Sequence, residues 1–125
     1  MTNDLQIIQQ LQSKFGEFSY ELNSDKKVVE LIIGFNNVEN KDLELIGELT
    51  SLEELKLDYN DISTIQGLEK LTSLKYLNLD NSKITTTQGL YKLTSLQELH
   101  LAYTKIPKEE IKQFKINHPK IKVYD

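Results

Sequence analysis

The sequence contains no cysteine and no long run of apolar residues. Without cysteine, the chain can form neither disulfide bonds nor thiolate metal sites. No apolar stretch approaches the roughly 20 residues that a helix needs to cross a bilayer. Residues 1–6 contain no basic segment followed by an apolar one, so they do not read as a signal peptide. With 125 residues, we expect one small cytoplasmic domain that does not bind membranes.

Residues that would mark an enzyme are also scarce. We find no nucleophile–base pair, no glycine-rich phosphate loop and no metal-ligand cluster in the sequence. His100 and His118 are the only histidines, and neither has a second ligand at metal-binding spacing. We interpret His100 as a surface contact residue and His118 as part of the C-terminal end of the core. The sequence therefore predicts no enzymatic activity, no cofactor and no metal.

The net charge of −4 argues against a polyanionic partner such as nucleic acid. Lysines between residues 105 and 122 do form a basic segment, but it lacks arginine and interleaved aromatic residues. Acidic residues are concentrated between residues 39 and 61. We therefore expect one end of the molecule to be acidic and the other end to be basic.

Three copies of one pattern follow each other at a constant interval. They begin at Leu49, Leu71 and Leu93, and each reads Leu-Thr-Ser-Leu-x-x-Leu-x-Leu. A weaker copy precedes them, and the interval from its Val28 to the counterpart Leu52 is slightly longer than the regular one. This difference indicates two inserted residues between positions 39 and 42. A fixed period of this length predicts a solenoid.

Each copy predicts one short strand and a return along the outside of the solenoid. The last two leucines are two residues apart, so both point to one face of a strand, and successive copies form a parallel sheet. Asn36 and Asn60 follow the strands, where an amide can bond backbone groups as the chain turns away. Ser82 and Thr104 hold this position in the later copies, and Thr87 replaces an apolar residue. We therefore expect a looser outer side in the copy that begins at Leu71, which is the third repeat when the weaker copy is counted.

Both ends of the repeats are expected to carry caps, because a terminal repeat has no neighbour. A helix over about residues 3–15, begun by Asn3 or Thr2, precedes a hairpin of strands at 18–22 and 27–33. The second of these strands is so continuously apolar that we expect both its faces to be covered, or nearly so. After residue 107, a helix and a last strand follow. The regular repeat interval places Ile121 beside Leu99, Val123 beside Leu101 and Lys122 beside His100.

The residues that carry the pattern resemble leucine-rich repeats. They are Leu49, Leu52, Leu55, Leu57, Asn60, Ile62, Ile65 and Leu68, and they are similar to the 22-residue class of bacterial internalins. The resemblance implies an α/β fold, a short curved right-handed solenoid with a parallel β-sheet on its concave side. It also implies a concave surface that binds proteins. Within a single domain, 1–125, we assign an N-terminal helix and hairpin cap to 1–27, repeats to 28–106, and a C-terminal helix and strand cap to 107–125.

The outward-facing strand positions and the rim beside them form the predicted binding site. Its residues are Glu54, Lys56, Asp58, Tyr59, Tyr76, Asn78, Asp80, Glu98, His100 and Tyr103. Aromatic residues exposed among charged ones are typical of protein interfaces, although a merely solvated sheet face is the alternative interpretation. Because the patch is acidic, we expect a monomer that binds a protein with a basic surface. Adaptor, regulatory subunit and inhibitor remain open as roles, and the alternative function is a structural or surface-adhesion segment of a longer chain.

Asp58 and Asp80 should be neighbours on adjacent strands, where like charges oppose each other. Such a pair could bind a cation or act as catalytic carboxylates. It could equally be two hydrated side chains with Lys56 nearby. We favour the hydrated pair, because a flat sheet without an enclosing loop makes a poor active site.

Overall fold

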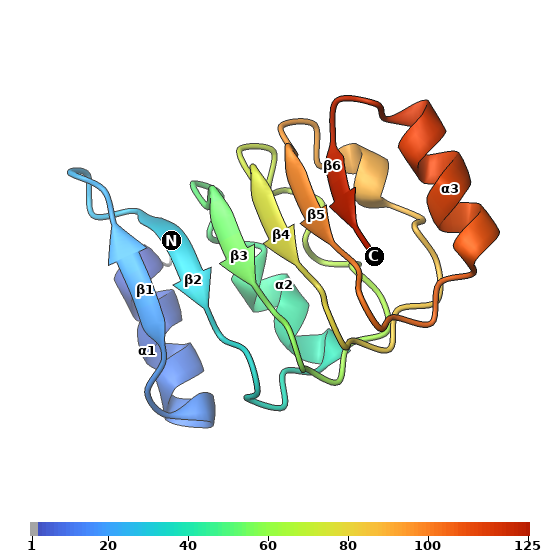
Figure 1. Cartoon of the computed structure of the whole chain (residues 1–125). Coiled ribbons are helices and arrows are strands. Elements are labelled where there is room, and N and C mark those ends of the chain that lie inside the picture. The colour runs from blue at the N-terminus through green and yellow to red at the C-terminus, as the bar shows by residue number, and fades with distance from the viewer. Residues whose placement is uncertain (1–2) are drawn as a thin grey trace.

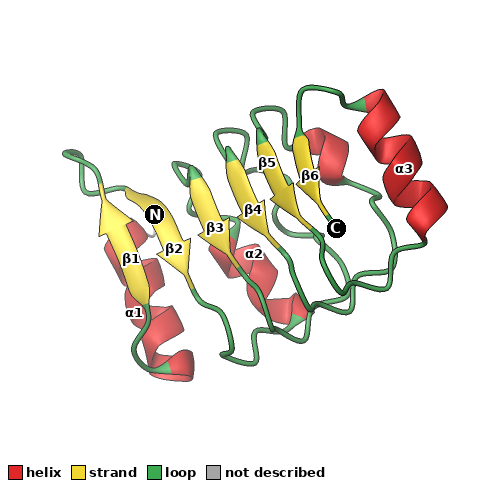
Figure 2. Ribbon diagram, viewed as in Figure 1, coloured by secondary structure: helices red, strands yellow, loops and turns green. Residues whose placement is uncertain are grey.

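The computed structural model describes residues 3–125, which form a single sheet with helices and loops along one side. Its six strands follow chain order from β1 to β6, with the first pair antiparallel and the others parallel. Figure 1 shows α1 and α2 behind the sheet and α3 beside its last strand. Figure 2 shows that loops form much of the remaining outer side. The predicted repeat architecture is thus confirmed, and we call the uncovered side of the sheet the open face.

Helix α1 (Asp4–Phe15) covers the first repeat. Asn3 begins the helix with a capping box, in which the side chains of Asn3 and Gln6 each accept a hydrogen bond from the other residue's N–H. The alternative predicted cap, Thr2, lies outside the described residues. On the inner side of the helix, Ile7, Ile8 and Leu11 are buried, whereas Leu5 is 37% exposed.

Strands β1 (Ser19–Leu22) and β2 (Val28–Ile32) form the predicted hairpin. Asp4 joins this hairpin to α1, because its carboxylate accepts a hydrogen bond from the Val28 N–H at 2.9 Å. On the other side of β2, Ile32 is half-buried on the open face, with Lys56 as its register partner on the next strand. The helices lie on one side of the sheet only (Figure 1), so the inner face of β2 is buried and the side chains on its open face are half-buried.

Strands β3 (Glu54–Lys56), β4 (Tyr76–Asn78) and β5 (Glu98–His100) carry the central repeats. The register partners across β2 to β5 are Leu31, Leu55, Leu77 and Leu99, and all four are 0% exposed. Apolar residues that return along the outer side complete the same core. Full burial of one such side chain contributes about 1.5–3 kcal/mol. The leucine stack therefore holds strands that are only three residues long.

The length of each repeat follows from its outer side. Leu55 pairs with Leu77 at the regular repeat interval, and the described chain between them contains no helix. The next unit keeps this interval with one short 3₁₀ turn, η2 (Leu90–Lys92). Leu31 pairs with Leu55, and this unit, which is longer than the regular repeat, holds η1 (Asn40–Asp42) and α2 (Leu43–Ile46). A helix advances only about 1.5 Å per residue, so a unit that contains one needs more residues to return to the sheet.

The same reasoning explains the one error in the predicted register. Strand β6 (Lys122–Tyr124) follows helix α3 (Lys108–Asn117), and Leu99 pairs with Val123 instead of Ile121. Tyr124 consequently pairs with His100, the position that the regular interval assigned to Lys122. The interval lengthens in this unit because α3 replaces the loop of the preceding repeats.

Asn60 fulfils the role that the sequence predicts for the asparagine of the repeat. Its buried Oδ1 accepts hydrogen bonds from the N–H groups of Asn36 at 3.1 Å and Val38 at 2.9 Å. Its Nδ2 donates to the carbonyl oxygens of Ile33 at 2.8 Å and Leu57 at 3.1 Å. One side chain thus satisfies backbone groups of two successive repeats.

Ser82 occupies the equivalent position in the next repeat and is also buried. Its hydroxyl is the one buried side-chain polar atom without a hydrogen-bond partner among residues 3–125. The serine side chain is shorter than asparagine, and its Oγ makes none of the bonds to the preceding repeat that Asn60 makes. In the last repeat, Thr104 Oγ1 donates to the Leu101 carbonyl oxygen at 2.9 Å, a contact within its own repeat.

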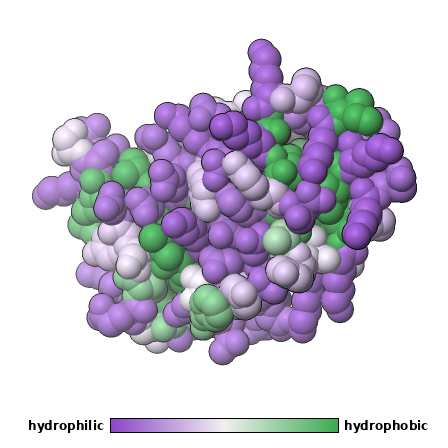
Figure 3. Space-filling view, viewed as in Figure 1, coloured by the Kyte–Doolittle hydropathy of each residue, from purple (hydrophilic) through white to green (hydrophobic). Residues whose placement is uncertain are grey.

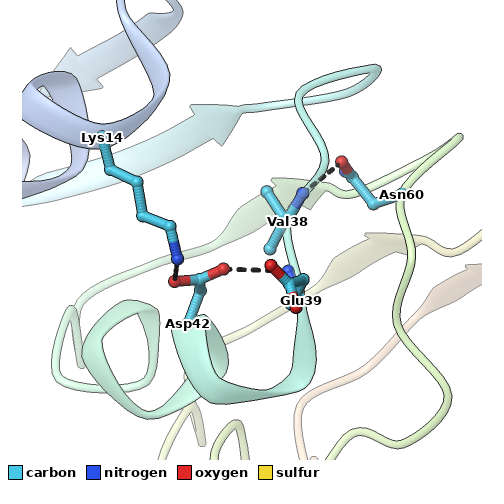
Figure 4. A network of polar contacts seen from close by, with 5 residues as sticks. All are labelled: Lys14, Val38, Glu39, Asp42 and Asn60. Carbon is cyan, nitrogen blue, oxygen red and sulfur yellow. Dashed lines mark hydrogen bonds and ion pairs between the residues drawn. The ribbon is translucent and has the colours of Figure 1, made fainter.

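The inserted residues of the first repeat form a contact with α1. Lys14 makes an ion pair with the buried side chain of Asp42, whose second oxygen accepts a hydrogen bond from the Glu39 N–H at 2.9 Å. Figure 4 shows these contacts together with the bond between Asn60 and Val38. The insertion therefore places a carboxylate where it connects the N-terminal helix to the first repeat.

The outer side of the third repeat is held by α3. Glu110 Oε2 accepts hydrogen bonds from Thr86 Oγ1 at 2.7 Å, from the Thr87 N–H at 2.6 Å and from Thr87 Oγ1 at 3.0 Å. These bonds, led by the one from the Thr87 N–H, lower the pKa of Glu110 below its ordinary value. At position 87, hydrogen bonds to Glu110 of α3 thus replace the apolar packing of the other repeats. The repeat pattern did not predict this contact.

Candidate protein-binding surface

The side chains of the open face alternate with the buried leucines and form two rows across the strands. The first row is Glu21, Glu30, Glu54, Tyr76, Glu98 and Lys122, and the second row is Ser19, Ile32, Lys56, Asn78, His100 and Tyr124. Neighbouring strands lie about 4.8 Å apart. The structure therefore brings together the six predicted strand residues Glu54, Lys56, Tyr76, Asn78, Glu98 and His100.

An aromatic cluster lies at the centre and C-terminal end of these rows. The His100 ring stacks on Tyr124 with a centroid separation of 4.7 Å and lies 5.1 Å from the Tyr76 ring. Glu98 holds His100 from the same strand, with 2.8 Å between Oε2 and Nε2. Lys56 places its Nζ 5.7 Å from the centre of the Tyr76 ring. Burial, followed by the nearby charge of Glu98, raises the pKa of the Tyr76 hydroxyl above its ordinary value.

An acidic row lies at the N-terminal end of the open face. Glu21, Glu30 and Glu54 are direct register partners on β1, β2 and β3. Like charges directly opposite each other destabilise a sheet. Partial burial of Glu30, followed by the charges of Glu21 and Glu54, raises its pKa above the ordinary value. Lys122 lies at the other end of the same row, so the open face is acidic at β1 to β3 and basic at β6.

Asp58 and Asp80 follow β3 and β4 at equivalent repeat positions, as the sequence predicts. Asp80 Oδ1 accepts a hydrogen bond from the Ala102 N–H at 2.8 Å, so this carboxylate holds the backbone of the next repeat. Asp58 lies against Gly34, where an added Cβ atom would be 3.0 Å from Asp58 Oδ1. The Asp80 side chain therefore holds neighbouring backbone, whereas the Asp58 side chain lies close to the Gly34 backbone of the preceding repeat.

The residues that directly follow the strands form a rim along one edge of the open face. They are Phe35, Tyr59, Asn81 and Tyr103, and all four have a left-handed backbone with φ between 58° and 59°. The Phe35 and Tyr59 rings stack with centroids 4.1 Å apart and planes 14° apart. Phe35, Tyr59 and Tyr103 are 70%, 49% and 86% exposed. The rim thus presents large rings to solvent at backbone positions that aromatic residues rarely adopt.

Figure 3 shows that the middle of the open face is mainly hydrophilic, with hydrophobic side chains gathered nearer its two ends. A shallow groove of about 460 Å³ runs along the first row, between Glu54, Tyr76 and Glu98 and the lysines Lys120 and Lys122. This shape, a wide surface with charges of both signs and a few rings, suits contact with another macromolecule better than enclosure of a small substrate.

Sequence reasoning missed three contributors to this surface. Tyr124 was assigned to the wrong register, although the greater length of the last unit, implied by a helix after Pro107, could have corrected it. Glu21 pairs with Glu30 across a hairpin whose register the turn determines. The stacking of Phe35 on Tyr59 follows from three-dimensional spacing between neighbouring repeats.

Two further findings concern the described chain, residues 3–125. No helix there is long and apolar enough to span a bilayer. No group of three or more His, Asp or Glu side chains there is arranged to hold a metal ion. His118 lies at the end of α3, half-buried, with its ring 4.4 Å from that of Phe114. This placement agrees with its interpretation as a structural residue at the C-terminal end of the core.

Comparisons with known proteins agree with this architecture. Residues 50–92 match the family model for leucine-rich repeats, in two copies. A leucine-rich repeat protein of Leptospira interrogans has a TM-score of 0.58 and 27% identity over 66% of the chain. The match covers 21% of that protein, so the chain spans about one fifth of its length. No curated protein matches the sequence.

A second solved structure shares the fold over almost the whole chain. It is the leucine-rich repeat ectodomain of the receptor kinase SOBIR1 from Arabidopsis thaliana, with a TM-score of 0.57 and 15% identity. The match covers 98% of this chain and 90% of that one, and at this identity it concerns the fold alone. Leucine-rich repeat domains commonly mediate protein–protein interaction. Assignment to the 22-residue internalin-like class stays a prediction, but residues 50–92 match leucine-rich repeats and the described chain has the fold of a leucine-rich repeat solenoid.

Proposed function

We propose that the protein is a non-enzymatic interaction module that binds a partner protein through the open face of its sheet. The contact comprises the first and second rows from β1 to β6 and the rim beside them. The partner presents a basic surface to the acidic end of this face. Adaptor, regulatory-subunit and inhibitor roles would all use such a contact.

The acidic row is the observation that carries this proposal. Glu21, Glu30 and Glu54 oppose each other across three strands, an arrangement that reduces the stability of the free protein. The raised pKa of Glu30 has the same repulsion among its causes. Lysine or arginine side chains of a partner would turn this repulsion into attraction. The acidic row therefore lowers the stability of the free protein and strengthens its attraction to a basic partner.

The aromatic cluster supplies the second part of the contact. The His100 ring already packs against both Tyr76 and Tyr124 on the open face, so these rings lose little side-chain entropy when a partner covers them. Tyrosine is also enriched among interface residues that contribute most to affinity. We therefore place the apolar centre of the interface at this cluster and its charged border at the acidic row.

The proposal can be tested with a partner captured from the source cell and then purified for titration. The open-face variant combines Tyr76→Ala with His100→Ala, and the matched outer-side variant combines Lys70→Ala with Tyr91→Ala, both exposed. We expect the open-face variant to bind more weakly by at least about 2 kcal/mol, which is about 30-fold. The outer-side variant should bind like the unaltered protein. Thermal melts of both variants would establish that they are folded.

The opposite result would contradict the proposal directly. If the open-face variant binds normally and the outer-side variant does not, the partner contacts the loops behind the sheet. If both variants bind normally, the open face does not contribute to the interaction.

A further inference from the structure

The backbone of the rim does not require the stacked rings of Phe35 and Tyr59. Phe35 and Tyr59 donate their backbone N–H groups to the Asp58 and Asp80 carbonyl oxygens, and Asn81 donates its N–H to Ala102 in the same way. The same left-handed backbone therefore forms with asparagine at this position, and it suits asparagine better than an aromatic residue. The rings are also largely exposed rather than packed in the core. We call this pair of residues the rim platform.

The surroundings of the rim platform carry negative charge. A shallow groove of about 680 Å³ beside it is lined by Phe35, Asn37, Glu39, Tyr59, Asn60, Asp61 and Asn81. Its charged lining residues are both acidic, and they are neighbours, because Glu39 and Asp61 form a parallel backbone bridge. Lys83 forms an ion pair with Asp61, with 2.6 Å between Nζ and Oδ1. The groove thus combines flat aromatic area with an excess of carboxylate.

The groove beside the platform extends from Tyr59 to Asn81, on the side of the next repeat. The two rings follow the direction in which the repeats succeed one another, with Phe35 on one side of Tyr59. The residue at the same rim position in the next repeat is Asn81, whose side chain is short. A planar group could therefore lie on the second face of Tyr59 above Asn81, with the carboxylate of Asp61 lining the same groove.

We propose that the rim platform binds an arginine side chain of the partner protein. A guanidinium group is planar, stacks on aromatic faces and can donate paired N–H bonds to a carboxylate, whereas a lysine ammonium group offers a point charge only. An arginine side chain at this place could stack on the Tyr59 ring and donate hydrogen bonds to the carboxylates of the groove at the same time. This inference rests on the proposed function, since it names one anchor of a basic protein partner.

Short peptides test the anchor without the partner. The probes are acetyl-Gly-Arg-Gly-amide, its lysine counterpart and its citrulline counterpart, which keeps the shape of arginine without the charge. Titration of ¹⁵N-labelled protein would follow the amide signals of Tyr59, Asp61 and Asn81. We expect saturable shifts with the arginine peptide and at least about fivefold weaker binding of each of the other two, because stacking and charge both contribute.

A variant and its control locate the effect. Tyr59→Asn keeps a residue suited to the left-handed backbone, and we expect it to weaken binding of the arginine peptide at least about tenfold. Tyr91→Asn removes an exposed tyrosine from the outer side and should leave binding unchanged. Equal binding of the arginine and lysine peptides, or unchanged binding by Tyr59→Asn, would overturn the proposal. Amide signals remote from the rim would report whether each variant keeps its fold.

The captured partner separates failure of this inference from failure of the proposed function. If Tyr76→Ala with His100→Ala weakens partner binding but Tyr59→Asn does not, the open face is the interface and the rim platform is not an anchor. If Tyr59→Asn weakens both peptide and partner binding while the open-face variant binds normally, the anchor stands and the proposed interface is wrong.

Discussion

Asn60 and Ser82 hold the same position in successive repeats but satisfy the backbone to different extents. Asn60 makes four hydrogen bonds of 3.1 Å or less to backbone groups, whereas the Ser82 hydroxyl makes none. A buried polar group that loses its partner costs about 1–3 kcal/mol. The contribution of this repeat position to the stability of the fold therefore depends on whether its side chain reaches the neighbouring repeat.

We predict that Asn60→Ala lowers the free energy of unfolding by at least about 2 kcal/mol, because several buried backbone groups lose their partners. Ser82→Ala should change it by less than about 0.5 kcal/mol or raise it slightly, since no hydrogen bond is lost. Urea unfolding monitored by circular dichroism would measure both. Equal losses in the two variants would show that the hydrogen bonds of Asn60 do not stabilise the fold.

Glu30 and Glu110 predict opposite effects of pH on stability. The pKa of Glu110 is lowered in the folded protein, so its contribution is present above the ordinary value of 4.5 and is lost as pH falls through the lowered pKa. The pKa of Glu30 is raised, so its ionisation opposes folding, and this penalty disappears as pH falls through the raised pKa toward 4.5.

Glu110→Ala should therefore destabilise the protein at pH 7, and Glu30→Gln should stabilise it. The effect of Glu30→Gln should shrink as pH falls toward 4.5, and the effect of Glu110→Ala should shrink only below 4.5. Thermal melts between pH 3 and pH 8 would compare each variant with the unaltered protein. Glu109→Ala, an exposed neighbour on α3, serves as the control and should have little effect. A loss of stability in Glu30→Gln at pH 7 would contradict the repulsion assigned to the acidic row.

Tyr103 allows the strain at the rim to be measured without the loss of a ring contact. It is 86% exposed, its backbone is left-handed at φ 59°, and its ring stacks on no other described aromatic residue. We predict that Tyr103→Asn raises the free energy of unfolding by up to about 1 kcal/mol, because asparagine tolerates this conformation better. A destabilised variant in urea unfolding would mean that the tyrosine has a structural role.

At the scale of elements, α1 and α3 close the two ends of the repeat stack by different means. Helix α1 buries apolar residues and forms the Lys14–Asp42 ion pair. Helix α3 buries Ile111 and Phe114 and holds the third repeat through Glu110. Each cap therefore combines apolar burial with polar contacts to a neighbouring repeat.

The N-terminal cap gives a prediction with a matched control. Ile8 is 1% exposed and Leu5 is 37% exposed on the same helix. Ile8→Asp should lower stability by more than about 3 kcal/mol, because it places an unpaired carboxylate in the core, whereas Leu5→Asp should have a small effect. Deletion of residues 1–22 should cause aggregation or unfolding, measured by light scattering and thermal melts. A soluble monomer with an unchanged melting temperature would rule out the capping role.

At the scale of the whole molecule, charge is separated along the sheet. The acidic row lies over β1 to β3, and Lys122 with the lysines of α3 lies at the opposite end. The expectation of one acidic and one basic end agrees with this arrangement. Such a field acts over about 8–10 Å at physiological ionic strength, so it influences the rate at which partners meet more than the contact they finally make.

We therefore predict that Glu54→Lys slows association with a basic partner and reduces the dependence of the association rate on salt concentration. Glu69→Lys, on the outer side, is the charge-matched control and should leave the association rate nearly unchanged. Stopped-flow or surface-binding measurements at several salt concentrations would determine both rates. An unaltered salt dependence in Glu54→Lys would place the basic partner elsewhere.

The sequence alone determined the repeat architecture and most of the open face. Leu55, Leu77 and Leu99 occupy the same environment in each repeat, so the same residue recurs at a constant spacing that can be read directly. Side chains two residues apart on a strand share a face, which was sufficient to bring Tyr76 and His100 together. These features depend only on the spacing of residues along the chain, so they can be read from the sequence.

Only the tertiary structure decided the contacts that break the period. The register of β6 depends on how many residues α3 needs to pass along the outer side, which shifts Tyr124 onto His100. Glu110 meets Thr87, distant in the sequence, because α3 lies against the third repeat. The stacking of Phe35 on Tyr59 depends on the distance between neighbouring repeats. Such contacts join residues far apart in the chain. Their distances depend on how the elements pack, which the repeat pattern does not specify.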